Sequence, residues 1–245
     1  TGFHPELTGR EDAAPDKWAK EREEIQSLLT PEEYEAARRS TLNAHYTSPE
    51  LISHMWTMMR KLGFTGGRVL EPSMGVGSFF GLMPADLRGQ SRLTGIELDR
   101  VTAVIAKHLY PNANVQQRGF ETLNAPDGFF DLAIGNVPFG DYQLSDRRYK
   151  ALSPTIHNYF FLKSLDKVRP GGFVAFITST GTMDAANAKR IREVLAAKAD
   201  LVAAMRFPAE TFAKSAGTSV VTDLIILRKR LEGEKAKGTA WTNTK

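Results

Sequence analysis

The chain has 245 residues, of which 42% are hydrophobic, so it is long and apolar enough for one large domain with a sizeable core. Its net charge of +4 and isoelectric point of 9.2 suit a polyanionic partner and equally an ordinary enzyme. The absence of cysteine excludes disulfides and thiolate metal sites, and because the five histidines lack metal-ligand spacing and no apolar stretch could span a bilayer, we expect a metal-free, cytoplasmic protein.

Two helices are predicted ahead of the main pattern, over residues 16–29 and 31–39, the second opening with Pro31. Neither belongs to the alternation of strands and helices that follows. We therefore expect residues 1–41 to form a helical extension. The first residue is Thr rather than Met, and residues 231–245 are polar and linker-like, so the sequence suggests an excerpt from a longer polypeptide.

A glycine loop follows the first predicted strand, Arg68–Pro72. Its two glycines, Gly75 and Gly77, allow the backbone to approach a ligand closely. The loop is one residue longer than the dinucleotide fingerprint, and Glu71 stands before the glycines, where that fingerprint has no acid. A carboxylate there repels a pyrophosphate and suits a cationic amino acid or sulfonium. The loop therefore favours S-adenosylmethionine over NAD.

The second strand, Arg92–Leu98, ends in a carboxylate that suits a ribose. Glu97 lies 22 residues after Gly75, the separation at which a strand-tip acid accepts from ribose hydroxyls. Asp99 fits better as the N-cap of the next helix, which leaves Glu97 and Leu98 for the cofactor.

The third strand, 114–119, is followed by Phe120 and Glu121, a ring and a carboxylate that could hold an adenine. A solvated loop explains this pair equally well.

The fourth strand, Phe130–Asn136, runs into the tetrapeptide Asn136-Val137-Pro138-Phe139. On a strand end stiffened by Pro138, the Asn136 amide oxygen and the Val137 carbonyl can both accept from an exocyclic amino group, while Phe139 stacks on the heterocycle. An Asn-x-Pro turn would explain the tetrapeptide by itself. However, the first and fourth strands flank the expected switch in strand order, so their loops should face one crevice.

The loop over 140–150 interleaves basic and aromatic residues: Arg147, Arg148 and Lys150 with Tyr142 and Tyr149. This pattern suits phosphate contacts and base stacking, although a solvated surface loop accounts for it equally well. The next helix, 157–168, is more typical of the core, because its Phe and Leu residues cluster.

The remaining elements continue the alternation with a strand over 172–178, a helix over 184–199 and strands over 201–207 and 219–228. Seven strands alternating with helices predict an α/β, Rossmann-like fold, in which helices cover both faces of a mostly parallel sheet.

These motifs, in this order, resemble the S-adenosylmethionine-dependent DNA adenine-N6 methyltransferases whose cofactor motifs precede the catalytic one. Leu70–Gly77 resembles their Asp-Pro-x-x-Gly-x-Gly loop, with Glu71 for Asp. Residues 136–139 resemble their Asn-Pro-Pro-aromatic motif, with Val137 for the first proline. His45–Pro49 is similar to an element that packs over the methionine end of the cofactor, which implies cofactor contacts from Tyr46, Thr47 and Pro49. Further matches lie at 169–177 and 207–227.

The resemblance covers Leu42 to Arg230 and implies a class I methyltransferase fold with seven strands, the last of them antiparallel. It also implies that Asn136 touches both the cofactor and the target amine. Valine retains the main-chain carbonyl that this family uses after the asparagine, so Val137 should reduce only rigidity. The chain is also similar to methylase domains fused to helicases in large phage and plasmid proteins. The family's recognition domain normally follows the last motif, but fewer than twenty residues follow Leu227. Sequence specificity is therefore expected from a parent protein or a separate subunit.

Two alternatives stay open at this point. The same pocket can hold any planar amide or amine, so the target could be a protein glutamine or an RNA base rather than DNA. The second alternative is a catalytically silent, cofactor-binding module of a larger assembly. Val137 and the missing recognition domain favour it, whereas Asn136, Phe139 and Glu97 oppose it.

Overall fold

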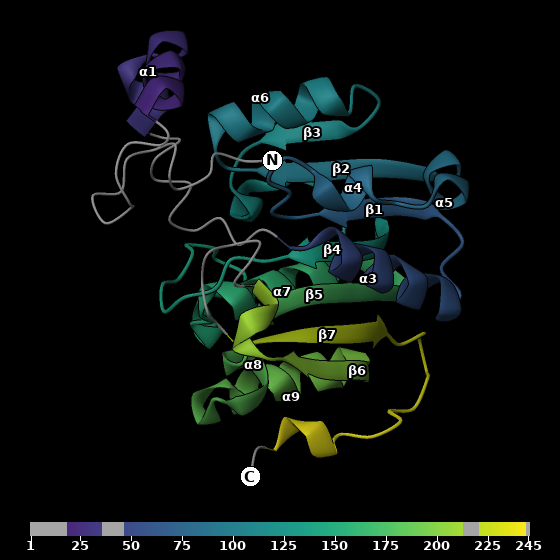
Figure 1. The fold of residues 1–245 in the computed structure, drawn as a ribbon. Coiled ribbons are helices and arrows are strands. Elements are labelled where there is room, and N and C mark those ends of the chain that lie inside the picture. The colour runs from purple at the N-terminus through teal and green to yellow at the C-terminus, as the bar shows by residue number, and fades with distance from the viewer. Residues whose placement is uncertain (1–18, 36–46, 213–220, 244–245) are drawn as a thin grey trace.

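The computed structural model describes residues 19–35, 47–212 and 221–243. At its centre lies a seven-stranded sheet in the order β3-β2-β1-β4-β5-β7-β6 (Figure 1). The strands are β1 (Gly67–Glu71), β2 (Ser91–Glu97), β3 (Asn114–Gln117), β4 (Phe130–Asn136), β5 (Val168–Ser179), β6 (Ala199–Phe207) and β7 (Thr222–Lys229). The first five are parallel, and β7 is antiparallel to both of its neighbours. The predicted α/β fold, with its last strand antiparallel, is confirmed.

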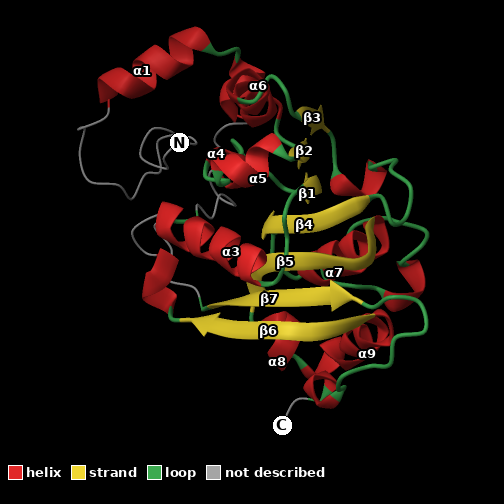
Figure 2. Ribbon diagram, turned by 90° about the vertical axis from the view of Figure 1, so that its right-hand side faces the viewer, coloured by secondary structure: helices red, strands yellow, loops and turns green. Residues whose placement is uncertain are grey.

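Helices cover both faces of this sheet (Figure 2). They are α3 (Pro49–Lys61), α4 (Ser78–Gly81), α5 (Ala85–Gly89), α6 (Arg100–Leu109), α7 (Ile156–Lys167), α8 (Gly181–Asp184) and α9 (Lys189–Lys198), with 3-10 turns η2 (Phe120–Thr122), η3 (Lys150–Leu152), η4 (Ala186–Ala188), η5 (Ala209–Phe212) and η6 (Ala240–Thr242). Helix α1 (Ala19–Leu28) buries none of its residues and lies apart from the sheet (Figure 2). Two apolar clusters form the core. One joins the sheet to α3, α4, α5 and α6, and the other joins it to α7 and α9. Alternate strand residues divide between the clusters: Val69 belongs to the first and Leu70 to the second.

The start of α3 follows from its sequence. The Ser48 hydroxyl accepts a hydrogen bond from the Leu51 amide at 3.3 Å, and Pro49 occupies the first turn, where its missing N–H is no loss. The helix buries the side chains of Leu51, Ile52, Met55, Trp56 and Met59. One side chain also reaches the next loop, because the Trp56 indole donates to the Phe79 carbonyl at 3.0 Å. The helix is thereby fixed beside the glycine loop.

Helix α7 is buried on all sides, since every residue from 156 to 166 is shielded from solvent. Its Phe161, Leu162 and Leu165 belong to the core, as predicted. Two charged residues, Lys163 and Asp166, are buried in the same helix and are each only 5% exposed. A helix that buries charge requires polar partners from neighbouring segments.

Several boundaries differ from the sequence-based expectations. Strand β5 begins at Val168 rather than 172, and α5 was not predicted. The helix expected over 184–199 is a 3-10 turn followed by α9. Of the two predicted amino-terminal helices, α1 is present, and residues 31–35 are helical.

Residues 231–243, expected as a linker-like tail, contact the domain. Glu234 pairs with Arg228 at 2.8 and 3.0 Å, and the Lys237 amide donates to Asp200 at 3.1 Å. The guanidinium of Arg192, fully buried, donates to the Thr242 carbonyl at 3.0 Å. The segment therefore packs on the domain, while the domain boundaries themselves stay a prediction.

Candidate active site

A cavity of about 580 Å³ opens at the carboxyl ends of β1 to β4. The glycine loop after β1 forms one wall, the loops after β2 and β3 form another, and the residues that follow β4 close it. Pro72 and Asn136 both line the cavity, which confirms that the loops after the first and fourth strands face one crevice. Strand β1 lies between β2 and β4, so the chain reverses its direction across the sheet at this position.

The two glycines of the loop, Gly75 and Gly77, have different structural roles. Gly75 has a φ of +54°, and no atom lies near the position that its Cβ would take. Gly77 has a φ of +83° and caps α4, and a Cβ on it would overlap the Tyr110 ring. Gly75 therefore leaves room beside the cavity, whereas Gly77 allows the helix start to pack on Tyr110. Gly77 does not line the cavity itself.

Glu71 is a buried carboxylate that lines the cavity. Its side chain is 2% exposed, and its Oε2 has no hydrogen-bond partner among the described residues. Burial, and then the nearby carboxylate of Glu97, raise the pKa of Glu71 well above its ordinary value. An unpartnered buried acid beside a cavity suits a positively charged ligand, because a cation would restore its ionised form.

Glu97 has two backbone partners that the sequence did not reveal. Its Oε2 accepts from the Gly75 amide and its Oε1 from the Asp99 amide, both at 2.8 Å. The side chain therefore braces the glycine loop while it lines the cavity, and an ionised carboxylate still has further lone pairs for a ligand. Burial raises the Glu97 pKa, and the two backbone bonds oppose this rise.

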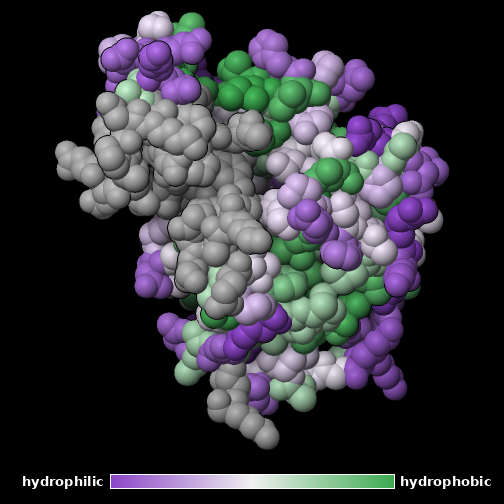
Figure 3. Space-filling model, viewed as in Figure 1, coloured by the Kyte–Doolittle hydropathy of each residue, from purple (hydrophilic) through white to green (hydrophobic). Residues whose placement is uncertain are grey.

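Asp99 caps α6 as predicted, accepting from the Thr102 amide at 2.7 Å. Leu98 also lines the cavity and is 74% exposed, an unusual exposure for a leucine. Figure 3 shows other apolar side chains gathered over α6, where Val104 and Leu109 are exposed.

Phe120 and Glu121 both line the cavity. The Phe120 ring is buried and packs at a tilt against the ring of Phe160, with 4.9 Å between the ring centroids, and Phe160 is a core residue that lines the cavity as well. Phe120 thus offers the cavity a rigid apolar wall, whereas Glu121 is half-buried at its edge.

The tetrapeptide Asn136–Phe139 begins where β4 ends. The Asn136 amide nitrogen donates to the Thr47 hydroxyl at 3.2 Å, and both side chains line the cavity. The Val137 N–H donates to the Ile177 carbonyl at 3.1 Å, which continues the pairing of β4 with β5 by one residue. Pro138 lines the cavity and Phe139 is half-buried. The valine N–H is therefore in use, a bond that a proline at this position could not make.

The amino-terminal element that is predicted to contact the cofactor is described only from Thr47 onward. Thr47 lines the cavity, whereas Pro49 is exposed in the first turn of α3 and lies outside the lining. Tyr46 lies outside the described residues.

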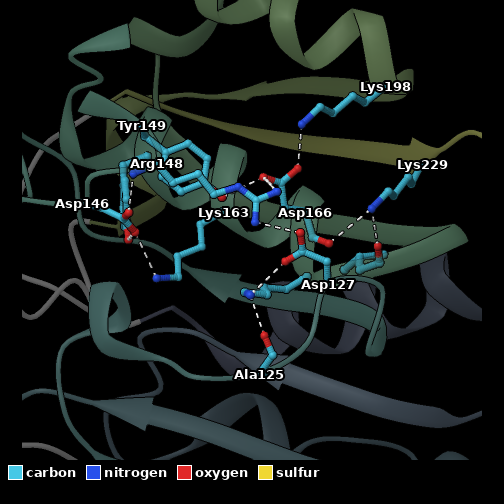
Figure 4. A network of polar contacts seen from close by, with 12 residues as sticks. Ala125, Asp127, Asp146, Arg148, Tyr149, Lys163, Asp166, Lys198 and Lys229 are labelled. Atoms are coloured by element: carbon cyan, nitrogen blue, oxygen red, sulfur yellow. Dashed lines mark hydrogen bonds and ion pairs between the residues drawn. The ribbon is translucent and has the colours of Figure 1, made fainter. Parts of the chain in front are cut away.

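The loop after the tetrapeptide contains residues of two kinds. Arg148 pairs with Asp127 at 2.7 Å and with Asp166 at 2.9 Å (Figure 4). Tyr149 is 6% exposed and its hydroxyl donates to Asp166 at 2.8 Å, so its ring presents no face to a base. Arg147 and Lys150 are exposed.

Sequence reasoning missed several residues that line the cavity. Tyr142, 51% exposed, was placed in a basic loop rather than at a cofactor site. The others are Ile52, Ser73, Met74, Val76, Ser78, Phe79, Ile96, Asp99, Arg100, Thr102, Gln117, Arg118, Gly119, Leu144, Ile156 and Phe160. Most of them follow the carboxyl end of a strand, and that position was the available signal.

Within the described residues, no group of three or more His, Asp or Glu side chains could bind a metal ion. Among the helices of that same part of the chain, none is both long and apolar enough to cross a bilayer.

The chain is similar in sequence to a known protein family and to a phage protein. A profile of the N-6 DNA methylase family matches residues 32–242. The chain is 34% identical over 194 residues to "Defense against restriction protein B" of Escherichia phage P1. This match covers 77% of the chain but only 8% of the phage protein, so the chain corresponds to a small part of that relative.

Two solved structures are similar in fold at low identity. A putative class I S-adenosylmethionine-dependent methyltransferase from Listeria monocytogenes superposes with a TM-score of 0.65 at 15% identity, covering 93% of this chain and 79% of the other. A modification subunit of a putative type I restriction enzyme from Vibrio vulnificus gives 0.61 at 18% identity, covering 86% and 50%. Both confirm the fold expected for a class I methyltransferase.

Proposed function

Because the chain belongs to the N-6 DNA methylase family, we propose that it transfers a methyl group from S-adenosylmethionine to the N6 amino group of adenine in DNA. The observation that carries this proposal is that Asn136 lines the same cavity as Glu71 and the glycine loop. A group able to accept from an amino group and a group able to neutralise a cation therefore face one space.

The cavity fits S-adenosylmethionine. The unpartnered Oε2 of Glu71 suits the positively charged amino-acid end, and the open space beside Gly75 admits the ligand close to the backbone. Glu97 has lone pairs left for ribose hydroxyls, and Leu98 and Phe120 provide apolar surface for the adenine ring. When bound, this cofactor supplies a methyl group already activated by its sulfonium. The task of the protein is then chiefly to align the acceptor nitrogen.

The acceptor side is formed by Asn136 and Val137. The amide nitrogen of Asn136 donates to the Thr47 hydroxyl, and the amide oxygen is the atom that would accept from a target amine. The Val137 carbonyl would accept from the second amino hydrogen, so that the nitrogen lone pair points at the methyl group. Phe139 would stack on the base. An adenine N6 is unreachable inside a duplex, so the base must flip out or come from a single strand.

The reaction is tested by incubating the protein with tritiated S-adenosylmethionine and an adenine-containing DNA, with RNA and protein offered in parallel. We expect label in DNA only, recovered as N6-methyladenine after digestion to nucleosides. Label in RNA or in protein glutamine would instead support the alternative targets. Asn136→Ala should abolish transfer while cofactor binding, followed by calorimetry, remains. Full activity in that variant would contradict the proposed acceptor.

We also propose that DNA sequence recognition lies outside the domain, in a longer polypeptide or a separate subunit. The relative from phage P1 supports this, since the chain spans 8% of its length. The contacts of residues 231–243 and the family match to residue 242 favour extending the proposed domain, 42–230, to that position. This chain should then bind DNA weakly, through exposed residues such as Arg147 and Lys150. Nanomolar, sequence-selective DNA binding at physiological salt would argue against the proposal that sequence recognition lies outside this domain.

A further inference from the structure

Helix α7 passes beside two loops that the proposed reaction requires. One is the loop after β3, defined here as the adenosine loop, residues 119–123. The other is the loop after the tetrapeptide, defined here as the acceptor loop, residues 140–149. Both contribute to the cavity, and so do Ile156 and Phe160 of α7. One turn beyond Phe160, the helix carries Lys163.

The Lys163 ammonium contacts both loops. It donates to the Glu121 carbonyl of the adenosine loop at 2.7 Å and pairs with the Asp146 carboxylate of the acceptor loop at 3.2 Å. Its side chain is 6% exposed, and the ammonium lies 5.4 Å from the centre of the Phe120 ring. Figure 4 shows the side chain reaching toward Asp146. A buried charge with these two partners ties the loops together more firmly than a surface ion pair would.

Asp146 in turn fixes the acceptor loop. Its carboxylate accepts from the Tyr159 hydroxyl at 2.7 Å and from the Arg148 amide at 3.0 Å. Within the same loop, the Tyr142 carbonyl accepts from the Ile156 amide at 2.9 Å, and Tyr142 and Leu144 line the cavity. A displacement of Asp146 would therefore move side chains that face the ligand.

We propose that Lys163 is a positioning residue for methyl transfer, through which occupation of the adenosine loop by the cofactor sets the position of the acceptor loop. This inference rests on the proposed function, because it requires a cofactor in the cavity. Burial lowers the pKa of Lys163, whereas the hydrogen bond that its ammonium donates to Asp146 raises it, so the ion pair favours the charged form of the amine.

The helix supplies a matched control. Lys167 lies one turn further on and makes the same kind of contacts, donating to the Ala125 carbonyl and pairing with Asp127 at 2.9 Å. Neither of these partners lines the cavity. Lys163→Met and Lys167→Met therefore remove equivalent charges from one helix, and only the first should uncouple the two loops.

The test is hydrogen–deuterium exchange by mass spectrometry with saturating S-adenosylhomocysteine. In the unsubstituted protein, the ligand should slow exchange in residues 119–123 and in 140–149. In Lys163→Met the adenosine loop should stay protected while the acceptor loop loses most of its protection, and Lys167→Met should behave as the unsubstituted protein. Equal acceptor-loop protection in Lys163→Met, or equal loss in Lys167→Met, overturns the inference. If the ligand slows exchange nowhere in the unsubstituted protein, the proposed cofactor binding is overturned, and the coupling between the loops is overturned with it.

A second variant guards against misfolding of the first. Asp146→Asn keeps the size of the side chain and removes the charge, so it should uncouple the loops as Lys163→Met does, and the double variant should show no greater loss. With cofactor saturating, kcat on DNA should fall about tenfold in Lys163→Met, while the cofactor Kd changes less than about threefold, as expected for one contact in a charged network. A purely structural role would instead lower the melting temperature alone. If the losses of acceptor-loop protection in the two single variants add up in the double variant, Lys163 and Asp146 do not act through the same contact.

Discussion

Replacing Glu71 with glutamine keeps the shape of a buried side chain and removes its charge. At a pH where Glu71 is ionised in the complex, truncating one partner of a buried charge pair costs about 2–5 kcal/mol, or roughly 30-fold to 5,000-fold in cofactor affinity. The upper part of this range applies because Glu71 is 2% exposed and its Oε2 has no other partner among the described residues.

The pH dependence follows from the raised pKa of Glu71. Below that pKa the free protein must lose a proton before it can pair with a cation, which costs about 1.4 kcal/mol per pH unit. The affinity for S-adenosylmethionine should therefore rise up to tenfold per unit as the pH increases, and binding should release a proton. In Glu71→Gln both effects disappear. The free protein shows the opposite trend, since a carboxyl with a raised folded-state pKa loses its stabilisation as the pH rises through that value.

Calorimetry with S-adenosylmethionine at pH 6.5, 7.5 and 8.5, in two buffers of different ionisation enthalpy, measures affinity and proton release together. The control is Glu50→Gln, which alters an exposed acid of α3 outside the cavity lining and should leave both quantities unchanged. An affinity of Glu71→Gln within threefold of the unsubstituted protein, with the same pH slope, would refute the reasoning.

Three further predictions concern stability. Val137→Pro should lower the free energy of unfolding, measured in urea, by about 1–3 kcal/mol, because the hydrogen bond to the Ile177 carbonyl is lost. Val137→Ala keeps the N–H and should be the more stable of the two variants. The reverse order of stability would contradict this role of the Val137 N–H. Burial lowers the pKa of His157 to about 4, so the unfolded chain takes up a proton first as the pH falls from 6.5 to 4, and stability should drop by up to about 3 kcal/mol in that window. His157→Gln should flatten that part of a pH-resolved melting curve, and an unchanged slope would count against a buried neutral imidazole. Ending the chain after Arg230 removes the Thr242 carbonyl, which accepts from the buried Arg192. The free energy of unfolding should fall by about 1.5–3 kcal/mol relative to a chain ending at Asn243, as measured by thermal melting. Equal melting temperatures would show that residues 231–243 do not contribute to stability.

The sequence predicted those features that depend on local pattern. The seven strands, the loop after Pro72 and the tetrapeptide at Asn136 all follow from periodicity and from the geometry of parallel sheets. The N-cap role of Asp99 was also predicted, because a capping bond spans only three residues.

Hydrogen bonds between residues distant in the sequence could not be predicted from it. Glu97 was assigned to the ribose alone, although it also accepts from the Gly75 amide 22 residues away. The pattern over 140–150 predicts phosphate contacts and base stacking, or else a solvated surface loop, yet Tyr149 is buried against Asp166, which follows it by 17 residues. Such pairings depend on how α7 packs, and a helix that is buried on all sides gives no amphipathic pattern from which its packing could be inferred.

Strand β7 has a consequence for how the domain is made on the ribosome. It is the last of the described strands in chain order, yet it lies between β5 and β6, and its Leu224 to Leu227 are at most 1% exposed. The strands that build the cavity are synthesised well before it, whereas the edge of β5 has no partner until residues 222–229 emerge. During that interval the nascent chain presents an open, apolar strand edge, a template for aggregation. A fragment ending before residue 222 should therefore require a chaperone or precipitate, even though every described residue that lines the cavity is present.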